Sequence, residues 1–226
     1  MDNGGEHLRQ TFADELEQLR LQVELMAVRV DQNLERMRGV LEAGDESLVD
    51  LALKADDDID AMNVSLTERS YDLLRREAPV ASDLRFIVSV VRVLGELERI
   101  GDLALRVIKL APERELMAEN PPTFDILVAM TEHVVDRYRL ALRAWATMDF
   151  GLATELAAVS RAMDVFYERL MAELLRLDGP DAVRQAVTTF TAGRSIERIG
   201  DHAGIIGARL RYLISGDPAH LSAEVR

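Results

Sequence analysis

The sequence predicts an all-α protein in which six long helices form two similar three-helix bundles. All six prolines lie between long segments that are rich in Leu, Ala, Glu, Arg and Val. These segments show the helical periodicity of apolar residues and lack the alternation that is typical of strands. Short connections between long helices make consecutive helices antiparallel neighbours, so a helical bundle follows.

A duplicated motif predicts a tandem repeat. The octapeptide LERIGDLA at 97–104 recurs as IERIGDHA at 196–203. Glu98 and Glu197 are 99 residues apart, and Asp60 and Asp164 are 104 apart. Self-similarity at a long period indicates a duplicated unit. We therefore predict one compact unit with a three-helix repeat at 7–110, a second at 123–214, and a loosely held tail at 215–226.

Individual helix ends follow from turn and capping residues. Asp45 and Asp149 are favoured N-cap residues, and turns are expected near Ala78 and Gly179. The segment APERELMAENPP at 111–122 is the longest connection and separates the repeats. The predicted helices span 7–42, 45–77, 81–110, 123–148, 150–177 and 181–214.

Composition excludes several classes of partner and site. The chain has 226 residues, a formal net charge of −13 and no cysteine. An acidic protein is a poor ligand for nucleic acid or anionic lipid, and without thiols there is no disulfide or thiolate metal site. The polar N-terminal segment does not resemble a signal peptide, and no apolar run reaches the roughly 18 residues needed to span a bilayer. We expect a soluble protein, with peripheral membrane association at most.

Each copy of the octapeptide carries two acids one helical turn apart. These are Glu98 with Asp102, and Glu197 with Asp201. Like charges at this spacing repel by roughly 0.2–0.5 kcal/mol. The helical angles place both pairs within an apolar stripe rather than on the charged face. Because this placement destabilises the helix, we infer that the four acids are present for a reason other than helix stability.

The preceding helix of each repeat also carries acids on its apolar face. In the first repeat these are Asp56 and Asp60, again four residues apart. In the second repeat Asp164 has Ser160 at the upstream position and Glu168 one turn downstream. Counted from the predicted turns, the acids of paired helices lie at similar heights. Each repeat is thus predicted to gather three or four carboxylates.

Carboxylates grouped against apolar surface require compensation. Three means stay open: raised pKa values, pairing with nearby arginines such as Arg99 and Arg194, or a bound multivalent cation. All-oxygen ligation favours hard ions such as Mg²⁺, Mn²⁺, Ca²⁺ or iron. His202 lies about 140° from Glu197 on its helix and is expected to be a packing or surface residue. Gly101 and Gly200 are expected to allow close helix approach.

Few enzyme classes fit the sequence. A ferritin-like di-iron site needs Glu-x-x-His pairs, and no histidine of this chain has a Glu three residues before it. HExxH, a P-loop and a GxSxG elbow are absent as well. Metal-assisted hydrolysis at a carboxylate cluster stays open, although no substrate-positioning motif accompanies it.

Two ERIGD motifs in a frame of two three-helix repeats resemble the PhoU family, whose members are bacterial regulators of phosphate uptake. The resemblance covers roughly residues 8–213 and is supported by PVASDLR at 79–85 and by the DDDID run at 56–60. It implies multinuclear metal sites on acidic motifs, holding iron, zinc, manganese or magnesium. The implied metal residues are Asp56, Asp60, Glu98 and Asp102 in the first repeat, and Asp164, Glu168, Glu197 and Asp201 in the second. Ser160 departs from the motif, so Glu168 is the expected replacement.

The resemblance also implies a cytoplasmic, non-enzymatic adaptor. Family members restrain the phosphate-starvation response when phosphate is plentiful, and they link the ATPase of the phosphate ABC transporter to a sensor histidine kinase. A homodimer is the expected assembly. Two alternatives are a PhoU-like paralogue that controls another transporter or dormancy, and a metal-dependent phosphoester hydrolase.

Overall fold

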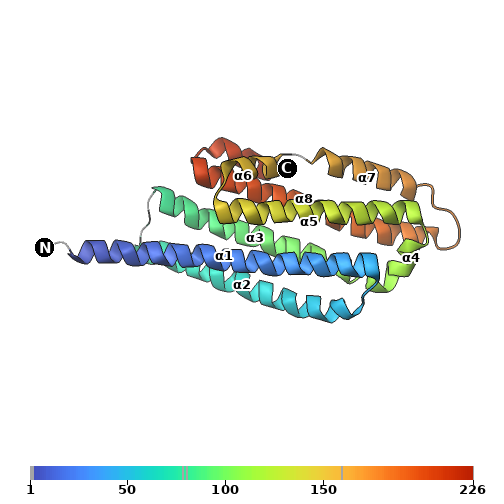
Figure 1. The fold of residues 1–226 in the computed structure, drawn as a ribbon, viewed down its shortest axis with the longest axis horizontal. Coiled ribbons are helices and arrows are strands. Elements are labelled where there is room, and N and C mark those ends of the chain that lie inside the picture. Colours follow the sequence, from blue (N-terminus) through green and yellow to red (C-terminus); the bar gives the residue numbers. More distant parts are fainter. Residues whose placement is uncertain (1–2, 78, 80, 159, 226) are drawn as a thin grey trace.

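The computed structural model describes residues 3–77, 79, 81–158 and 160–225. Every regular element within these ranges is a helix, which confirms the predicted all-α class. The long helices lie roughly parallel to the long axis of the molecule (Figure 1).

The first repeat contains three long helices, as predicted. They are α1 (Asn3–Ala43), α2 (Ser47–Glu77) and α3 (Ala81–Ile108). α1 ends at Gly44, whose φ of 67° is the left-handed conformation that glycine adopts without strain. Asp45 then accepts a hydrogen bond from the Ser47 amide at 3.1 Å, which satisfies one free N–H at the start of α2.

The connection between the repeats contains helical turns. It comprises the 3₁₀ turn η1 (Ala111–Glu113) and the one-turn helix α4 (Arg114–Ala118). Arg114 donates from Nε to the carbonyl of Leu41 at 3.0 Å and from Nη2 to that of Glu42 at 2.9 Å. These carbonyls lie in the last turn of α1, so the connection also caps that helix.

The second repeat differs from the prediction. It contains α5 (Pro121–Thr147), α6 (Phe150–Ala157), α7 (Arg161–Leu174) and α8 (Ala182–Ser215). The predicted helix at 150–177 is therefore wrong, because two helices, α6 and α7, replace it. Counting α-helices of eight residues or more, the described ranges hold seven instead of six.

The break between α6 and α7 has a local cause. Ala158 is extended, with a ψ of 142°, and Ser160 is the N-cap of α7, whose side chain accepts from the Met163 amide at 3.3 Å. A serine that caps a helix cannot lie inside it. Helical periodicity continues across the break, which is why the sequence pattern alone does not reveal it.

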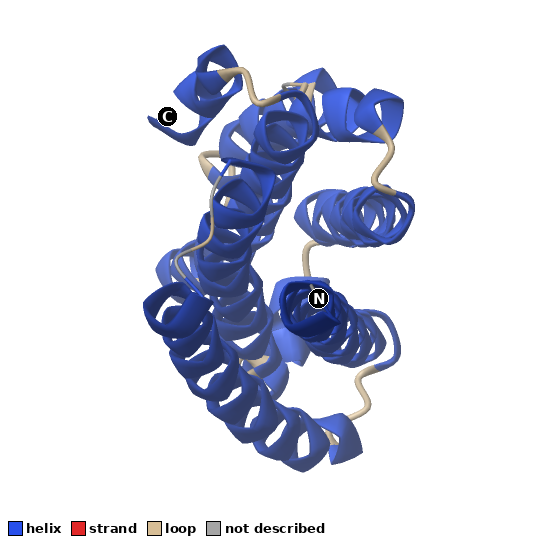
Figure 2. Cartoon of the chain, turned by 90° about the vertical axis from the view of Figure 1, so that its left-hand side faces the viewer, coloured by secondary structure: helices blue, strands red, loops and turns tan. Residues whose placement is uncertain are grey.

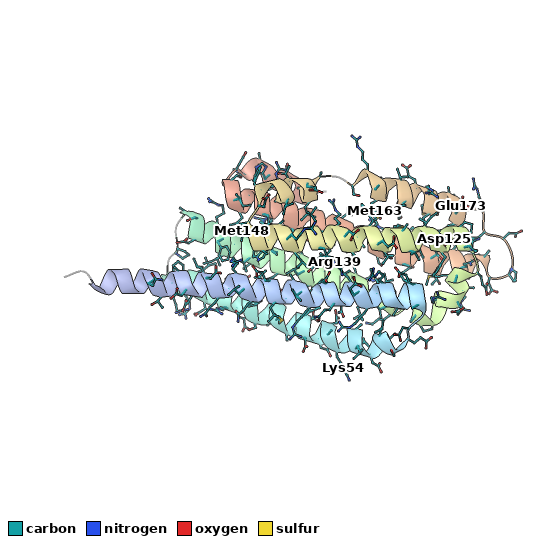
Figure 3. All side chains as sticks on the ribbon, in the orientation of Figure 1. Lys54, Asp125, Arg139, Met148, Met163 and Glu173 are labelled. Carbon is teal, nitrogen blue, oxygen red and sulfur yellow. The ribbon has the colours of Figure 1, made fainter. Side chains whose placement is uncertain are left out.

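The two repeats pack against each other along their length. Viewed end-on, α1 and α5 lie side by side against the inner face of a curved layer that contains α3 and α8 (Figure 2). The buried Tyr138 of α5 donates its hydroxyl to the Ala27 carbonyl of α1 at 2.7 Å. At the surface between the same helices, Arg139 pairs with Asp31 at 3.2 Å and with Glu35 (Figure 3). The core is thus shared by both repeats.

The backbones of α8 and α6 approach each other closely at Gly207 of α8. A Cβ atom there would lie 2.7 Å from the Ala157 amide nitrogen and 2.9 Å from the Ala153 carbonyl oxygen, both in α6. Only glycine allows this separation of the two backbones.

Beyond α8 the chain reverses and packs back on it. Gly216 takes the left-handed conformation, and the 3₁₀ helix η2 (Pro218–Val225) contacts α8. The His220 ring lies 5.6 Å from that of Phe150, centroid to centroid. No helix in the described ranges is both long and apolar enough to cross a membrane.

Candidate metal centres

The first group of predicted acids lies where α2 and α3 run side by side. Asp56 and Asp60 come from α2, and Glu98 and Asp102 from α3. Burial and the charges of Asp60 and Asp102 together raise the pKa of Asp56 to about 6, against the opposing charge of Lys109. We call these four residues the first cluster.

Two other members of the first cluster, Asp60 and Glu98, have pKa values raised in the same direction. Desolvation and the charge of Asp102 raise the pKa of Asp60 above its ordinary value. Desolvation, again with Asp102, raises the pKa of Glu98, and Arg99 only partly offsets this. Desolvation is the largest cause of each shift and the neighbouring carboxylates add to it, which is an arrangement that a bound cation relieves.

Arginine pairing compensates the first cluster weakly. Arg99 lies 3.5 Å from Asp102, measured Nη1 to Oδ2, and 3.6 Å from Glu98, measured Nε to Oε2. Its side chain is 61% exposed. Exposed ion pairs of this length contribute at most about 1 kcal/mol. A deficit of positive charge remains.

Four carboxylates are a donor set that suits hard cations. As placed, however, no three His, Asp or Glu side chains within the described residues converge closely enough to ligate one ion. The donor chemistry of the first cluster thus fits a metal, while rotation of the side chains would be needed to bind it.

The first cluster lies at the edge of the core rather than inside it. Of the apolar residues on its helix faces, Ile87 and Leu94 are buried, but Val64 and Tyr71 are 58% and 57% exposed. Gly101 stands beside it, and a Cβ there would meet Asp56 Oδ1 at an ordinary 3.6 Å. The predicted close approach at Gly101 is therefore not required, and the same holds at Gly200, where the nearest atom would be 3.5 Å away.

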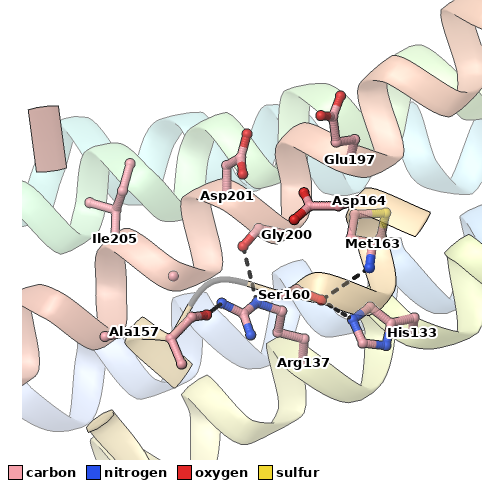
Figure 4. Close-up of a pocket in the computed structure, with 12 residues that line it drawn as sticks. His133, Arg137, Ala157, Ser160, Met163, Asp164, Glu197, Gly200, Asp201 and Ile205 are labelled. Atoms are coloured by element: carbon pink, nitrogen blue, oxygen red, sulfur yellow. Dashed lines mark hydrogen bonds between the residues drawn. The ribbon is translucent and has the colours of Figure 1, made fainter. Parts of the chain in front are cut away.

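In the second repeat, three predicted acids line one pocket of about 200 Å³ (Figure 4). They are Asp164 from α7, and Glu197 and Asp201 from α8. Glu168 is exposed one turn further along α7 and is not among the lining residues. We call this the second pocket.

Ser160 plays a different part from the one its spacing suggested. Its hydroxyl caps α7 and lies 2.7 Å from His133 Nε2. Burial and the charge of Arg137 lower the pKa of His133. Because Ser160 stands outside the helix that carries Asp164, the two are not a one-turn pair on one helix face.

Arg137 of α5 enters the second pocket. Its Nη2 donates to the carbonyls of Leu156 at 2.5 Å and Ala158 at 2.7 Å, and its Nε donates to Gly200 at 3.3 Å. The first two carbonyls end α6, so a cation at this position satisfies them and complements the helix dipole.

The acids of the second pocket have cations as neighbours. Arg194 pairs with Glu197 one turn before it. Desolvation by surrounding protein atoms raises the pKa of Asp201. Several nearby cations, including Arg194 and Arg137, lower it, and Arg194 has the largest effect among them. The pKa of Asp201 is still raised overall, but its charged neighbours are cations, whereas those that raise the pKa values of the first cluster are carboxylates.

Sequence reasoning missed the α5 residues of the second pocket. His133 and Arg137 belong to no motif, and the one available signal is that they lie 104 residues after Arg29 and Asn33. His202 does not line the pocket; its Nδ1 lies 2.6 Å from Glu96 Oε2 on α3.

Comparison with known proteins agrees with the duplicated architecture. The family model for the PhoU domain matches twice, at residues 23–111 and 127–210. The chain belongs to the PhoU family. Each match falls within one of the two repeats and includes one ERIGD motif.

Similar proteins of the PhoU family cover nearly the whole chain. The phosphate-specific transport system accessory protein PhoU homolog of Pseudomonas putida is 31% identical and covers 96% of this chain and 86% of its own. The accessory protein PhoU of Escherichia coli K12 is 28% identical, covering 98% and 93%. The crystal structure of PhoU from Pseudomonas aeruginosa superimposes with a TM-score of 0.84 at 31% identity, over 91% of this chain and all of that one.

Proposed function

We propose that this chain is a cytoplasmic regulator of phosphate uptake that restrains phosphate-starvation signalling when phosphate is plentiful. It would do so by docking to the ATPase of the phosphate ABC transporter and to a sensor histidine kinase. The observation that carries the proposal is the family match in both repeats, together with relatives named as accessory proteins of the phosphate-specific transport system.

We further propose that the first cluster holds a divalent or ferric ion. Iron, zinc, manganese and magnesium all accept carboxylate oxygen. Support comes from the grouping of four acids. Desolvation and the charges of neighbouring carboxylates raise the pKa values of three of them, Asp56, Asp60 and Glu98. A cation bound there would relieve this repulsion and join α2 to α3.

The proposed mode of action is binding rather than catalysis. The relatives are named accessory proteins. The Ser160 hydroxyl, which lies beside His133, already accepts the capping hydrogen bond of α7. Assay of phosphoester turnover with added Mn²⁺ tests this: turnover that is lost in Asp102→Asn would favour the hydrolase alternative.

A homodimer through α1 is the proposed assembly. Leu21, Leu25 and Val28 are 50%, 52% and 45% exposed, and their spacing places them on one face of the helix. A second copy of the same helix would cover this stripe. Leu25→Glu is expected to yield a monomer in light scattering; an unchanged mass would place the interface elsewhere.

The regulatory role is tested by gene deletion in the host. Without this chain, phosphate-scavenging genes are expected to be expressed in phosphate-rich medium, and the wild-type gene should silence them again. Complementation with Glu98→Gln then reports whether the first cluster contributes. Unchanged expression in the deletion strain would contradict the regulatory role.

A further inference from the structure

The two repeats make the same polar contact with different side chains. In the first, Asn33 of α1 donates from Nδ2 to the Ala52 carbonyl of α2 at 3.5 Å. In the second, Arg137 of α5 donates to the Leu156 carbonyl of α6 at 2.5 Å. Donor and acceptor are each displaced by 104 residues, the same offset that relates Asp60 to Asp164. Arg137 thus stands where the first repeat has a neutral amide.

A second arginine is added beside one acid of the pocket, although it does not line the pocket itself. Arg194 lies three residues before Glu197 and pairs with it. The position three residues before Glu98 is Gly95. A Cβ atom added to Gly95 would have no neighbouring atom within 4 Å. The first repeat therefore has space, but no side chain, where the second repeat has a guanidinium.

The acids change in the complementary direction. Asp56 of the first cluster corresponds to Ser160, which is neutral and serves as a helix cap. Arg99 has its counterpart in Arg198, so it does not distinguish the repeats. Three other cations of the first repeat, Arg29, Arg106 and Lys109, correspond to His133, Ile205 and Ala208. Of these, Lys109, exposed just beyond the end of α3, lowers the pKa of Asp56, whereas Arg29 pairs with Asp58 outside the first cluster.

From these substitutions we infer that the second pocket neutralises its carboxylates with Arg137 and Arg194 and takes no metal ion, so that metal binding by this chain belongs to the first cluster alone. A metal in the second pocket would meet the Arg137 guanidinium in the lining, would compete with Arg194 for Glu197, and would lack one carboxylate ligand. Figure 4 shows Arg137 reaching across the pocket from α5 towards Gly200 and Ala157.

This inference rests on the proposal that the first cluster binds a metal, and its first test measures that binding. Protein purified without chelator is titrated with Mn²⁺ alone. We expect the number of ions bound to be the same in wild type and Glu197→Gln/Asp201→Asn, and binding to be lost in Glu98→Gln/Asp102→Asn. A comparable loss in the second-pocket variant would overturn the inference.

A transplant tests the role of the arginine directly. Gly95→Arg places a guanidinium beside Glu98, at the position that Arg194 has beside Glu197. It is expected to weaken Mn²⁺ binding tenfold or more, whereas Gly95→Ala, the matched control, should bind as wild type does. Equal affinity in both variants would show that the arginine does not replace a metal.

A measurement without metal separates the inference from the proposed function. In chelator, Glu98→Gln is expected to raise the melting temperature by about 2 °C or more, because it removes repulsion, and Glu197→Gln to lower it by a similar amount, because it breaks an ion pair. If wild type binds no Mn²⁺, the metal proposal for the first cluster fails, and this comparison still decides whether arginine neutralises the acids of the second pocket. Equal shifts of the same sign would overturn it.

Discussion

His202 of α8 and Glu96 of α3 join the two repeats, with 2.6 Å between Nδ1 and Oε2. Both side chains are only 14% exposed. The repeats thus share a polar contact close to each ERIGD motif, in addition to their apolar core. Neither residue belongs to the acidic groups, so this contact can be altered without touching them.

Removing either partner of the His202–Glu96 pair is expected to destabilise the protein. Glu96→Ala and His202→Ala should each lower the free energy of unfolding by about 1–3 kcal/mol, because the remaining group stays partly buried without its partner. Urea denaturation of both single variants and the double variant should give a coupling of about 0.5 kcal/mol or more. The exposed pair Asp72–Arg75 is the control, with less coupling; equal coupling in the two pairs would contradict the prediction.

Removing the charge of Asp56 is expected to stabilise the metal-free protein. Its folded-state pKa is about 6, above the ordinary 3.8, so stability from this group is lost as pH rises from about 4 to 6. In chelator at pH 7.5, Asp56→Asn should add about 1–2 kcal/mol, which is less than the full shift implies because the site is partly solvated.

The control for Asp56→Asn is Asp125→Asn, which alters an exposed acid on α5. It should change the free energy of unfolding by less than about 0.5 kcal/mol. At pH 4 the gain from Asp56→Asn should largely vanish, since the carboxyl group is then protonated in the folded protein. A gain that persists at pH 4 would assign the effect to packing instead of charge.

Arg137→Ala is expected to loosen the end of α6. The carbonyls of Leu156 and Ala158 would lose their donor, at a cost of about 2–3 kcal/mol for a hydrogen-bonded charge. Hydrogen exchange should accelerate in 150–157 and 161–165 more than in α2. Arg143→Ala, an exposed position on the same helix, is the control. Protection that is unchanged in α6 would show that the cap is dispensable.

Two glycines of the long central helices should respond oppositely to the same substitution. Gly207→Ala forces a Cβ against the backbone of α6 and should lower stability by about 2 kcal/mol or more. Gly95→Ala meets open space within α3 and should raise it by about 0.5–1 kcal/mol through helix propensity. Thermal denaturation of the two variants tests this prediction. A lower melting temperature in both variants would contradict the contacts assigned to Gly95.

The sequence predicts the fold well because helix periodicity and capping residues are local signals. Gly44, Asp45 and Asp149 mark helix ends in the structure as the capping rules predict. The first cluster could also be anticipated, since a spacing of four residues and similar distances from a turn place the acids at similar heights. Whether these acids bind metal stays a prediction.

The second pocket could not be predicted in the same way. Its character depends on Arg137, which reaches the pocket from a helix that carries no motif, and on a break at Ser160 that leaves the apolar periodicity intact. Such tertiary contacts between distant residues have no local pattern. The offset of 104 residues between the repeats relates Arg137 to Asn33, but this correspondence points to the second pocket only after the contacts of both residues are known from the structure.

The interruption between α6 and α7 makes the repeats mechanically unequal. α2 is an unbroken rod of 31 residues, about 46 Å long at 1.5 Å per residue, with the first cluster partway along it. A small rotation imposed at Asp56 or Asp60 is carried to both ends of such a rod. In the second repeat the extended Ala158 separates α6 from α7, so the same displacement at Asp164 would not pass from α7 into α6, and its unbroken helix is instead α8, with 34 residues that include Glu197 and Asp201.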